Sequence, residues 1–525
     1  MTHFVLLLLA AAIAHTLARA TRAPATPLLV GAGIALGATG LLGDKSSIVR
    51  DALLLGAMFL VFFTGTELDP KRVGTQRNLA LRVGVLQFFS FGALGFVLSR
   101  LLAFDTMAAL QMAVALAASS TLVVVRVLQR QQRFYEPVGR LVLGVLLVQD
   151  ILVILMAAAL TASAQGPVGM LVALGKMLAL IALTGVLVRW VTPYVVLKLN
   201  LDEESLLLVV LAMLFAFIGA ARALELPLVV GAFLAGVSLS IFPINGLLRG
   251  LLSSLGDFFL AIFFVALGAT LALPGPRELL LTVVLSLSVL VLTPILVAAL
   301  LERAGLTARS GLDAGVMLSQ TSELSLIVGL LAAERGLIEE RTLSVIALVT
   351  VLTMMATPFL ATDRVVWRLL RWHPSRRRAR APVPRAHEAH ILLLGCGERG
   401  HALLDVLLAK NADVVVVDDD PAVVDELESR GVSALRGDGA DIHVLEAAGA
   451  RRARLVVSTL RRPADAVHVL SLLGDVPAYV RVFDDEDAER IRNEGGIPVL
   501  ESEATAERFA RWYADHATPS RTPPA

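Results

Sequence analysis

Cysteine and charge are both scarce in this chain. Cys396 is the single cysteine among 525 residues, which excludes an intramolecular disulfide framework and a zinc site built on several cysteines. Charged residues make up only 17% of the chain, whereas 56% of the residues are hydrophobic and the mean hydropathy is +0.76. A soluble core cannot hide that much apolar surface. We therefore expect lipid to cover most of the chain.

Apolar runs of about 17 to 25 residues, separated by charged or Pro- and Gly-bearing breaks, predict transmembrane helices. The first run lacks the positively charged start of a secretion signal, so we expect it to be retained. About thirteen helices are predicted, near residues 4–20, 26–42, 51–67, 79–101, 105–127, 137–161, 169–191, 204–222, 226–242, 251–273, 277–301, 311–333 and 342–361.

The positions of Lys and Arg predict the orientation of the chain. They favour the loops after odd-numbered helices, and by the positive-inside rule those loops face the cytoplasm. We predict a multi-pass protein of the inner membrane with a cytoplasmic C-terminal domain. The predicted parts are a transmembrane domain (1–362), a basic juxtamembrane linker on anionic lipid (363–388), a Rossmann-type domain (389–510) and a disordered tail (511–525).

The sequence pattern changes after His390. Short β-branched runs such as Ile391–Leu394 and Val414–Asp418 alternate with amphipathic helical stretches up to Leu500. This alternation predicts a parallel, doubly wound α/β sheet. The predicted fold class is thus a polytopic α-helical membrane protein joined to a C-terminal α/β domain.

Asp150 is a carboxylate in the middle of an apolar helix. Its nearest charges in the sequence are Arg140 and Lys176, and Gln149 is its only polar neighbour. A charge at that depth is costly and needs a reason. One carboxylate can hold a proton or a small cation in turn, which is the simplest physical basis for exchange. The alternative is a structural aspartate held by hydrogen bonds between helices.

Two clusters of polar residues interrupt predicted helices. Ser119, Ser120 and Thr121 lie within one, and Ser319–Glu323 lies within another. Hydroxyl side chains compete for backbone hydrogen bonds, and a break at membrane depth is tolerated where it lines a cavity or is buried in protein. Two broken helices in corresponding halves indicate the central site of a transporter. Ordinary packing of Ser and Thr between helices is the alternative.

A glycine-rich turn follows the first predicted strand of the soluble part. Gly395, Gly397 and Gly400 form a GxGxxG pattern that opens a helix, as in dinucleotide-binding turns. Asp418 closes the second strand, where a carboxylate can hold ribose hydroxyls, and Asp420 is the second candidate for that role. The alternative is a domain of this shape that has lost its ligand.

These segments together resemble the Kef-type branch of the second cation:proton antiporter family. The stretches that carry the resemblance are Phe63–Pro70 for G-x-E-L-D-P, Ala118–Thr121 for the first helix break, Gln149-Asp150 for the Gln-Asp pair, Val230–Gly236 for L-G-A-F-L-A-G, and Ser319–Glu323 for the second break.

The resemblance implies two inverted repeats, a homodimer, and a mobile core in which Asp150 binds cation and proton alternately. Gln149, Ser119, Ser120, Thr121 and Glu323 are the further ion- or proton-binding residues it implies, with K⁺ favoured over Na⁺. The sequence also departs from the family. Thr293 stands where family members usually carry a lysine, so we prefer electroneutral one-for-one exchange. Thr321 and Ser322 replace two glycines usual before Glu323.

The soluble part resembles the TrkA-N, or regulator-of-potassium-conductance, domain through Val417–Pro421 and Gly437–Asp441. The resemblance implies binding of NAD(H), AMP or ATP as a regulatory ligand without redox chemistry, with Asp438 among the binding residues. Cys396 lies inside the glycine turn. A small residue that fills the turn is a better interpretation of it than a redox switch.

Other classes of function fit the sequence less well. A nucleotide-gated potassium channel is the alternative function, but no TVGYG-like filter is present. A membrane-tethered NAD-dependent enzyme would need a catalytic residue beside the turn, where His401 is the only candidate. We expect no enzymatic activity, no resident metal and no nucleic-acid partner.

Overall fold

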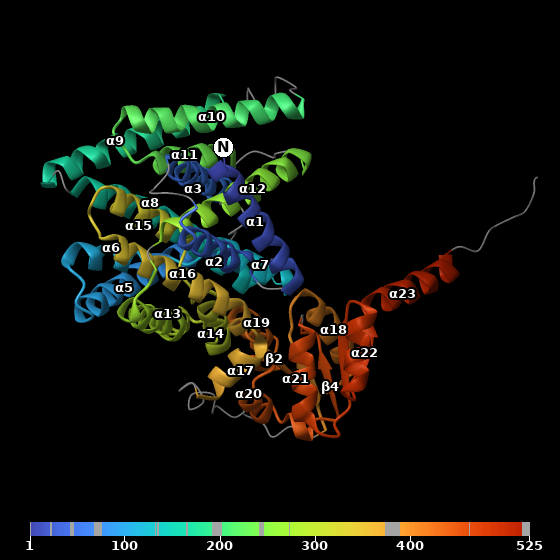
Figure 1. Cartoon of the computed structure of the whole chain (residues 1–525). Helices are drawn as coiled ribbons and strands as arrows, with labels where there is room; N and C mark the ends of the chain where they lie inside the picture. Colours follow the sequence, from blue (N-terminus) through green and yellow to red (C-terminus); the bar gives the residue numbers. More distant parts are fainter. Residues whose placement is uncertain are drawn as a thin grey trace, which may run out of the picture. The chain divides into compact units, whose positions relative to one another are not determined.

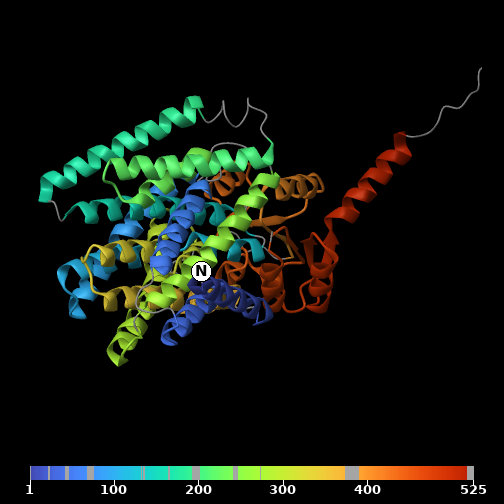
Figure 2. The same cartoon turned by 45° about the horizontal axis from the view of Figure 1, so that its top comes forward.

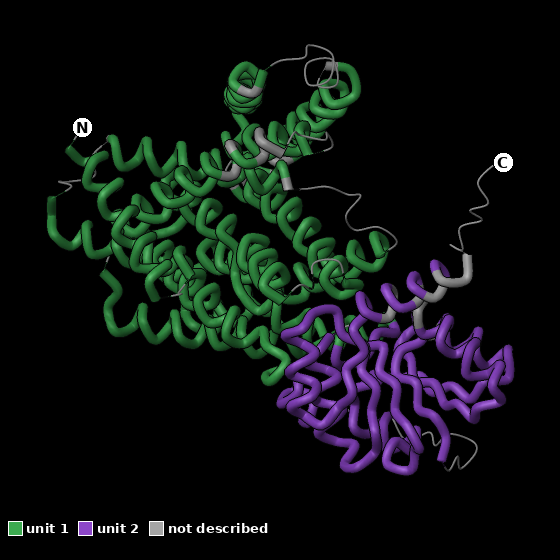
Figure 3. Tube along the Cα trace, turned by 90° about the vertical axis from the view of Figure 1, so that its right-hand side faces the viewer, with its two compact units in different colours: residues 1–304, 310–366 green, residues 305–309, 367–525 purple. Residues whose placement is uncertain are grey.

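The computed structural model describes residues 2–21, 24–41, 47–67, 76–131, 133, 136–163, 166–191, 202–240, 246–271, 273–372, 389–460 and 462–516 (Figure 1). The chain forms two compact units (Figure 3). Unit 1 comprises Met1–Ala304 and Ser310–Val366, and unit 2 comprises Gly305–Arg309 and Trp367–Ala525. The short segment 305–309 therefore groups with the C-terminal residues, although helices of unit 1 precede and follow it in the sequence.

Unit 1 is built from helices, shown from two directions in Figures 1 and 2. They are α1 (Thr2–Thr21), α2 (Ala25–Ala38), α3 (Ser47–Glu67), α5 (Arg77–Leu101), α6 (Thr106–Ala117), α7 (Thr121–Arg130), α8 (Pro137–Ser163), α9 (Gly166–Val186) with a π-helical turn at Leu187–Val191, α10 (Glu203–Ala223), α11 (Leu228–Ser240), α12 (Gly246–Thr270), α13 (Pro276–Arg303), α14 (Ala308–Met317), α15 (Glu323–Glu334) and α16 (Glu340–Leu360).

Each predicted transmembrane segment coincides with one helix or with a broken pair. Within the described ranges, nine helical segments are long and apolar enough to cross a membrane, with α6 and α7 counted together. The apolar helices α2, α11 and part of α12 are shorter. The fifth predicted segment is the pair α6–α7 and the twelfth is the pair α14–α15. The predicted polytopic fold with two broken helices is confirmed.

Glycine crossings between helices follow the pattern expected of inverted repeats. Gly33 of α2 packs against Gly268 of α12, and Gly65 of α3 packs against Gly236 of α11. The two broken helices are the fifth and twelfth predicted segments, seven places apart. Moving on by seven segments also leads from α2 to α11 and from α3 to α12. The crossing of α2 with α12 therefore corresponds to the crossing of α3 with α11. Because seven is odd, a chain that crosses the membrane once per segment runs in opposite directions through corresponding helices.

The crossing at Gly268 leaves no room for a side chain, which gives a stability prediction. A Cβ atom at Gly268 would lie 2.2 Å from the carbonyl oxygen of Val30. We expect Gly268→Val to lower the apparent Tm of the detergent-solubilised protein, since overpacking of this kind costs about 1–3 kcal/mol. The matched control is Gly219→Val, because a Cβ atom at Gly219 meets nothing within 4 Å. Equal melting temperatures for the two variants would contradict the crossing.

The C-terminal part of unit 2 is a six-stranded parallel sheet with the order β3-β2-β1-β4-β5-β6. This is the doubly wound sheet predicted from the sequence. Its elements are β1 (Ile391–Leu394), α18 (Glu398–Ala409), β2 (Val414–Asp418), α19 (Pro421–Ser429), β3 (Ser433–Arg436), α20 (Ile442–Ala447), β4 (Leu455–Ser458), α21 (Pro463–Leu473), β5 (Ala478–Val482), α22 (Asp485–Asn493), β6 (Ile497–Leu500) and α23 (Glu501–His516).

Two helices differ from the predicted linker and tail. The predicted linker begins with the helix α17 (Asp363–Trp372), and its remainder, 373–388, lies outside the described residues. The helix α23 runs from Glu501 to His516 and so enters the predicted disordered tail, which begins at residue 511. Its acidic first turn, with Glu501 and Glu503, favours a helix start, because carboxylates interact well with a helix N-terminus.

Candidate functional site

The site in unit 1 is built on the N-termini of two half-helices. The first four N–H groups of a helix have no partner within it, so serine is favoured just before a helix start. The Ser120 hydroxyl accepts a hydrogen bond from the Val123 amide at the start of α7, at 3.2 Å. The Ser322 hydroxyl accepts from the Leu324 amide at the start of α15, at 3.1 Å. These two caps explain why hydroxyl residues interrupt otherwise apolar helices.

The two breaks contact one another directly. The Ser119 hydroxyl donates to the carbonyl oxygen of Leu318 at 2.7 Å. The Gln320 side-chain amide donates in return to the carbonyl oxygen of Ser120 at 3.2 Å. The Leu318 carbonyl, just past the end of α14, thereby gains a partner across the crossing. The Ser120 carbonyl, which also accepts from the Val124 amide of α7 at 3.4 Å, gains a second donor. Segments about 200 residues apart in sequence thus form one polar centre inside an apolar unit.

Asp150 contacts this centre from α8. Its side chain is buried, at 1% exposure, and its Oδ2 atom accepts a hydrogen bond from the Thr121 hydroxyl at 2.9 Å. Thr121 is the first residue of α7, so the carboxylate meets the positive end of that half-helix dipole. The structure therefore brings together Asp150 and Thr121, which the sequence analysis named as parts of one site.

Glu323 occupies the corresponding place at the other half-helix. It is the first residue of α15, and its Oε1 atom accepts a hydrogen bond from the Ser120 hydroxyl at 2.6 Å. Ser120 thus caps α7 and also contacts the carboxylate at the start of α15. Each half-helix N-terminus is paired with one buried acidic side chain, Asp150 at α7 and Glu323 at α15.

Gln149 joins the site to α5 through a glutamine that the sequence analysis missed. Its Oε1 atom accepts from the Ser119 amide at 3.0 Å, and its side-chain amide donates to Oε1 of Gln87. Gln87 in turn donates to the carbonyl oxygen of Ala117 at 3.4 Å, at the end of α6. The available sequence signal was a lone side-chain amide, Gln87, within the apolar segment 79–101.

The chemistry of this centre suits a proton or a hard monovalent cation. Its polar atoms are carboxylate, hydroxyl, amide and carbonyl oxygens, the ligands that hard cations accept. Within the ranges that the structure describes, no group of three or more His, Cys, Asp or Glu side chains could hold a resident metal ion.

Thr293 is an uncharged residue at the position where the resemblance implies a lysine. Thr293 is buried on α13 beside Pro294. A Cβ atom at Gly315 of α14 would lie 2.6 Å from the Cα atom of Pro294, so α13 and α14 pack closely here. The side chain at 293 is thus enclosed by protein, as expected for a residue of the core. The preference for electroneutral exchange stays a prediction.

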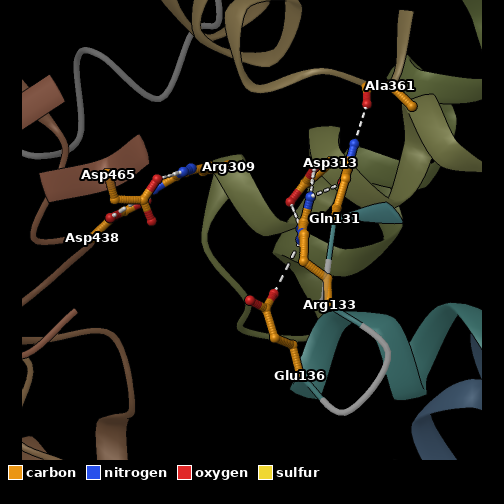
Figure 4. A network of polar contacts seen from close by, with 8 residues as sticks. All are labelled: Gln131, Arg133, Glu136, Arg309, Asp313, Ala361, Asp438 and Asp465. Carbon is orange, nitrogen blue, oxygen red and sulfur yellow. Dashed lines mark hydrogen bonds and ion pairs between the residues drawn. The ribbon is translucent and has the colours of Figure 1, made fainter. Parts of the chain in front are cut away.

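An ion pair that the sequence analysis missed joins the elements flanking the two breaks. The Arg133 guanidinium, between α7 and α8, contacts both carboxylate oxygens of Asp313 on α14 (Figure 4). It also contacts Glu136 at 3.1 Å and the side chain of Gln131 at 3.1 Å. Both members of the Arg133–Asp313 pair are at least 94% buried, since their side chains are 5% and 6% exposed.

The glycine turn of unit 2 has the geometry of a phosphate-binding loop. Gly395 has φ of +86°, a conformation that favours glycine. A Cβ atom at Gly400 would lie 2.5 Å from the carbonyl oxygen of Gly395, so only glycine lets α18 pack this closely on β1. A Cβ atom at Gly397 meets nothing within 4 Å, which leaves open space beside the backbone. Gly395 thus permits the tight turn, Gly397 leaves room for a pyrophosphate beside the backbone, and Gly400 permits close helix packing, as dinucleotide-binding turns require.

Asp418 lies beside this turn at the end of β2. Its Oδ2 atom accepts from the Cys396 amide at 2.5 Å and its Oδ1 atom accepts from the Asp420 amide at 2.9 Å. These bonds fix the carboxylate at the carboxyl edge of the sheet. Asp420 instead caps α19, where it accepts from the Ala422 amide at 2.9 Å. The geometry favours Asp418 over Asp420 as the ribose-binding candidate.

Cys396 and His401 have local structural contacts. The Cys396 side chain is fully buried, and burial raises the pKa of its thiol to about 11. The thiolate, which is the reactive form, is then scarce at neutral pH. His401 lies in the first turn of α18 with Nδ1 3.2 Å from the carbonyl oxygen of Gly397. These contacts favour packing roles for both residues.

Comparison with protein families matches both parts of the chain. Residues 5–362 match the family described as sodium/hydrogen exchanger, transmembrane. Residues 391–502 match the TrkA-N domain.

Solved structures also resemble the chain. The sodium proton antiporter MjNhaP1 from Methanocaldococcus jannaschii is 14% identical with a TM-score of 0.50, and the match covers 70% of this chain and 99% of that one. The TrkA-N domain of the inner membrane protein ybaL from Escherichia coli is 25% identical with a TM-score of 0.23, covering 24% and 98%. A structure of the GsuK channel bound to NAD is 19% identical with a TM-score of 0.21, covering 42% and 41%.

Proposed function

Because this chain belongs to the sodium/hydrogen exchanger family, we propose that it exchanges a monovalent cation for protons across the membrane, with Asp150 as the shared binding group. The predicted resemblance to antiporters that carry a TrkA-N domain is confirmed by the two family matches. Exchange follows if cation and proton occupy one carboxylate in turn, since each then displaces the other.

The contact of Asp150 with Thr121 is the observation that carries the proposal. A buried carboxylate at a half-helix N-terminus can lose its proton at tolerable cost, because the helix dipole and the hydroxyl stabilise the charge. Glu323, which is held by Ser120 at the other break, provides the second buried acid of the site. Gln149, Ser119 and Ser120 supply further oxygen atoms around the crossing.

We favour K⁺ over Na⁺ as the transported cation, on the resemblance of Gln149-Asp150 to the Kef-type pair. One-for-one exchange is the preferred stoichiometry because Thr293 brings no lysine charge that could compensate the movement of Asp150. The proposal includes a homodimer in the inner membrane with the TrkA-N domain in the cytoplasm. The surrounding lipid is then the partner of the exposed apolar helix faces.

Exchange in proteoliposomes tests this function. Vesicles that contain the full chain and a trapped pH indicator receive an outward K⁺ or Na⁺ gradient, and the internal pH is followed. We expect cation-driven acidification of the vesicles, faster with K⁺ than with Na⁺, and insensitive to a clamped membrane potential. Internal pH that follows neither gradient would contradict the function.

We further propose that a nucleotide, NAD(H) or AMP or ATP, binds at the glycine turn as a regulatory ligand. Asp418→Ala is expected to weaken binding of NADH, AMP or ATP to the full chain by about tenfold or more, which is about 1.4 kcal/mol and the scale of a lost hydrogen bond to a charged group. Isothermal titration calorimetry measures the effect. Asp425→Ala, at an exposed position of α19, is the matched control.

The result that would contradict this site is equal affinity in Asp418→Ala, Asp425→Ala and the wild type. No binding heat with any of the three nucleotides would favour a domain that has lost its ligand.

A further inference from the structure

The short segment 305–309, which contains the loop after α13 and the first residues of α14, is anchored on the Rossmann-type domain. Residues 305–309 belong to unit 2, and Arg436 at the end of β3 donates to the carbonyl oxygen of Gly305 at 2.7 Å. Gly305 has φ of +92°, so the chain turns sharply there. The segment ends at Arg309, whose side chain is only 6% exposed.

Arg309 is held by two carboxylates of the domain (Figure 4). Its Nη1 atom lies 3.1 Å and 3.4 Å from the oxygens of Asp438, and its Nη2 atom contacts Oδ1 of Asp465. Its guanidinium also lies over the ring of Trp367, 4.3 Å from the centroid, and that ring stacks on His468. A buried guanidinium with two carboxylates and an aromatic face is a specific binding arrangement for an arginine.

One of these carboxylates borders the predicted nucleotide site. Asp438 follows β3 at the carboxyl edge of the sheet, where its Oδ1 atom also accepts from the Ala440 amide at 2.9 Å. A Cβ atom at the next residue, Gly439, would lie 3.4 Å from Cβ of Leu394, the last residue of β1 before the glycine turn. Ligands of doubly wound sheets bind at this edge. Asp438 therefore contacts Arg309 and also borders the proposed nucleotide site.

The other end of the same helix reaches the transport site. Arg309 lies in the first turn of α14, which continues through Asp313 to Met317. Asp313 is paired with Arg133, and the helix ends at the break whose Leu318 carbonyl accepts from Ser119. α14 is thus one continuous helix of about three turns between Arg309 and the break.

We propose that Arg309 couples nucleotide occupancy to ion exchange, because Arg309 and the donor groups of a bound nucleotide are alternative partners of Asp438. This inference rests on the proposed regulatory function. A nucleotide that binds Asp438 weakens the ion pair between Asp438 and Arg309. The N-terminal end of α14 is then released. Arg309 is a positioning residue in this scheme and contacts neither the transported cation nor the proton.

Two measurements on the full chain test the coupling, with NADH and AMP as probes. The test variant is Arg309→Gln combined with Asp465→Asn, which removes the arginine without leaving Asp465 as a buried unpaired charge. Arg309→Lys tests whether charge alone suffices. The matched control is Arg303→Gln, at an exposed arginine in the last turn of α13. Calorimetry gives the nucleotide affinity, and proteoliposome exchange gives the rate with and without nucleotide.

Removal of a competitor for Asp438 should tighten nucleotide binding by about fivefold or more, the lower end of usual coupling between sites. The same variant should exchange ions at one rate with or without nucleotide, while Arg303→Gln responds as the wild type does. Unchanged or weaker affinity in the test variant would overturn the inference, as would a full nucleotide response. A wild type that binds neither probe also overturns it.

The two proposals fail in distinguishable ways. If the wild type shows no cation-driven proton flux, the proposed exchange is wrong, yet the affinities of wild type and variant still decide whether Arg309 competes for Asp438. If the wild type exchanges ions and binds nucleotide without a change in rate, exchange stands and the coupling through Arg309 is wrong.

Discussion

Asp150→Asn is expected to abolish cation-driven proton flux in proteoliposomes. Asparagine keeps the size of the side chain and can still accept from the Thr121 hydroxyl, but it can neither take up a proton at neutral pH nor attract a cation by charge. We expect the flux to fall to the level of protein-free vesicles, because asparagine cannot bind proton and cation in turn. The initial rate of internal pH change after a K⁺ pulse is the measurement.

The matched control for Asp150→Asn is Asp257→Asn. Asp257 is also an aspartate within an apolar membrane helix, α12, but its side chain is exposed rather than buried. We expect that variant to retain most of the wild-type rate. Persistent flux in Asp150→Asn, with both variants inserted in equal amounts, would remove Asp150 from the transport site.

Arg133→Met is expected to lower the stability of unit 1 by about 3–5 kcal/mol, because it leaves the Asp313 carboxylate buried without its arginine. Breaking the pair should also slow exchange, since Arg133 precedes α8 and Asp313 lies on α14, so the pair joins elements that flank both helix breaks. A large fall in the apparent Tm of the solubilised protein and a reduced exchange rate are the expected readouts.

The double variant Arg133→Met with Asp313→Leu separates charge from packing. Replacing a buried ion pair by apolar residues of similar volume is often neutral or stabilising, so we expect the double variant to recover most of the lost stability. A double variant as unstable as the single one would show that packing around Arg133 matters more than the charge pair. An unchanged Tm in the single variant would contradict the burial of the pair.

The fold was predictable because its signals are local. Hydropathy alone places the helices of unit 1, because long apolar runs mark them in the sequence, although α2 and α11 are shorter than the predicted runs. The breaks were predictable from Ser119–Thr121 and Ser319–Glu323, because serine and threonine before a helix start are capping residues as well as interruptions. The parallel sheet follows from the alternation of β-branched runs with amphipathic helices.

The pairing within the sites was not predictable, because it depends on packing between distant segments. Arg133 and Asp313 lie 180 residues apart, and nothing in either neighbourhood indicates the other. Gln87 was visible in the sequence as a lone amide in an apolar helix, but the sequence did not indicate that Gln149 is its partner. The sequence predicts for Arg309 only a basic residue in a cytoplasmic loop. Its ion pairs with Asp438 and Asp465 are visible only in the structure.

The dependence of the cation KM on pH tests the central claim, that cation and proton share Asp150, most directly. For competition at one carboxylate, the apparent KM for the transported cation should rise about tenfold for each unit by which the pH falls below the range where the site ionises, while the maximal rate stays nearly constant. A KM that stays constant from acidic to alkaline pH, in a protein that still exchanges ions, would contradict a shared site.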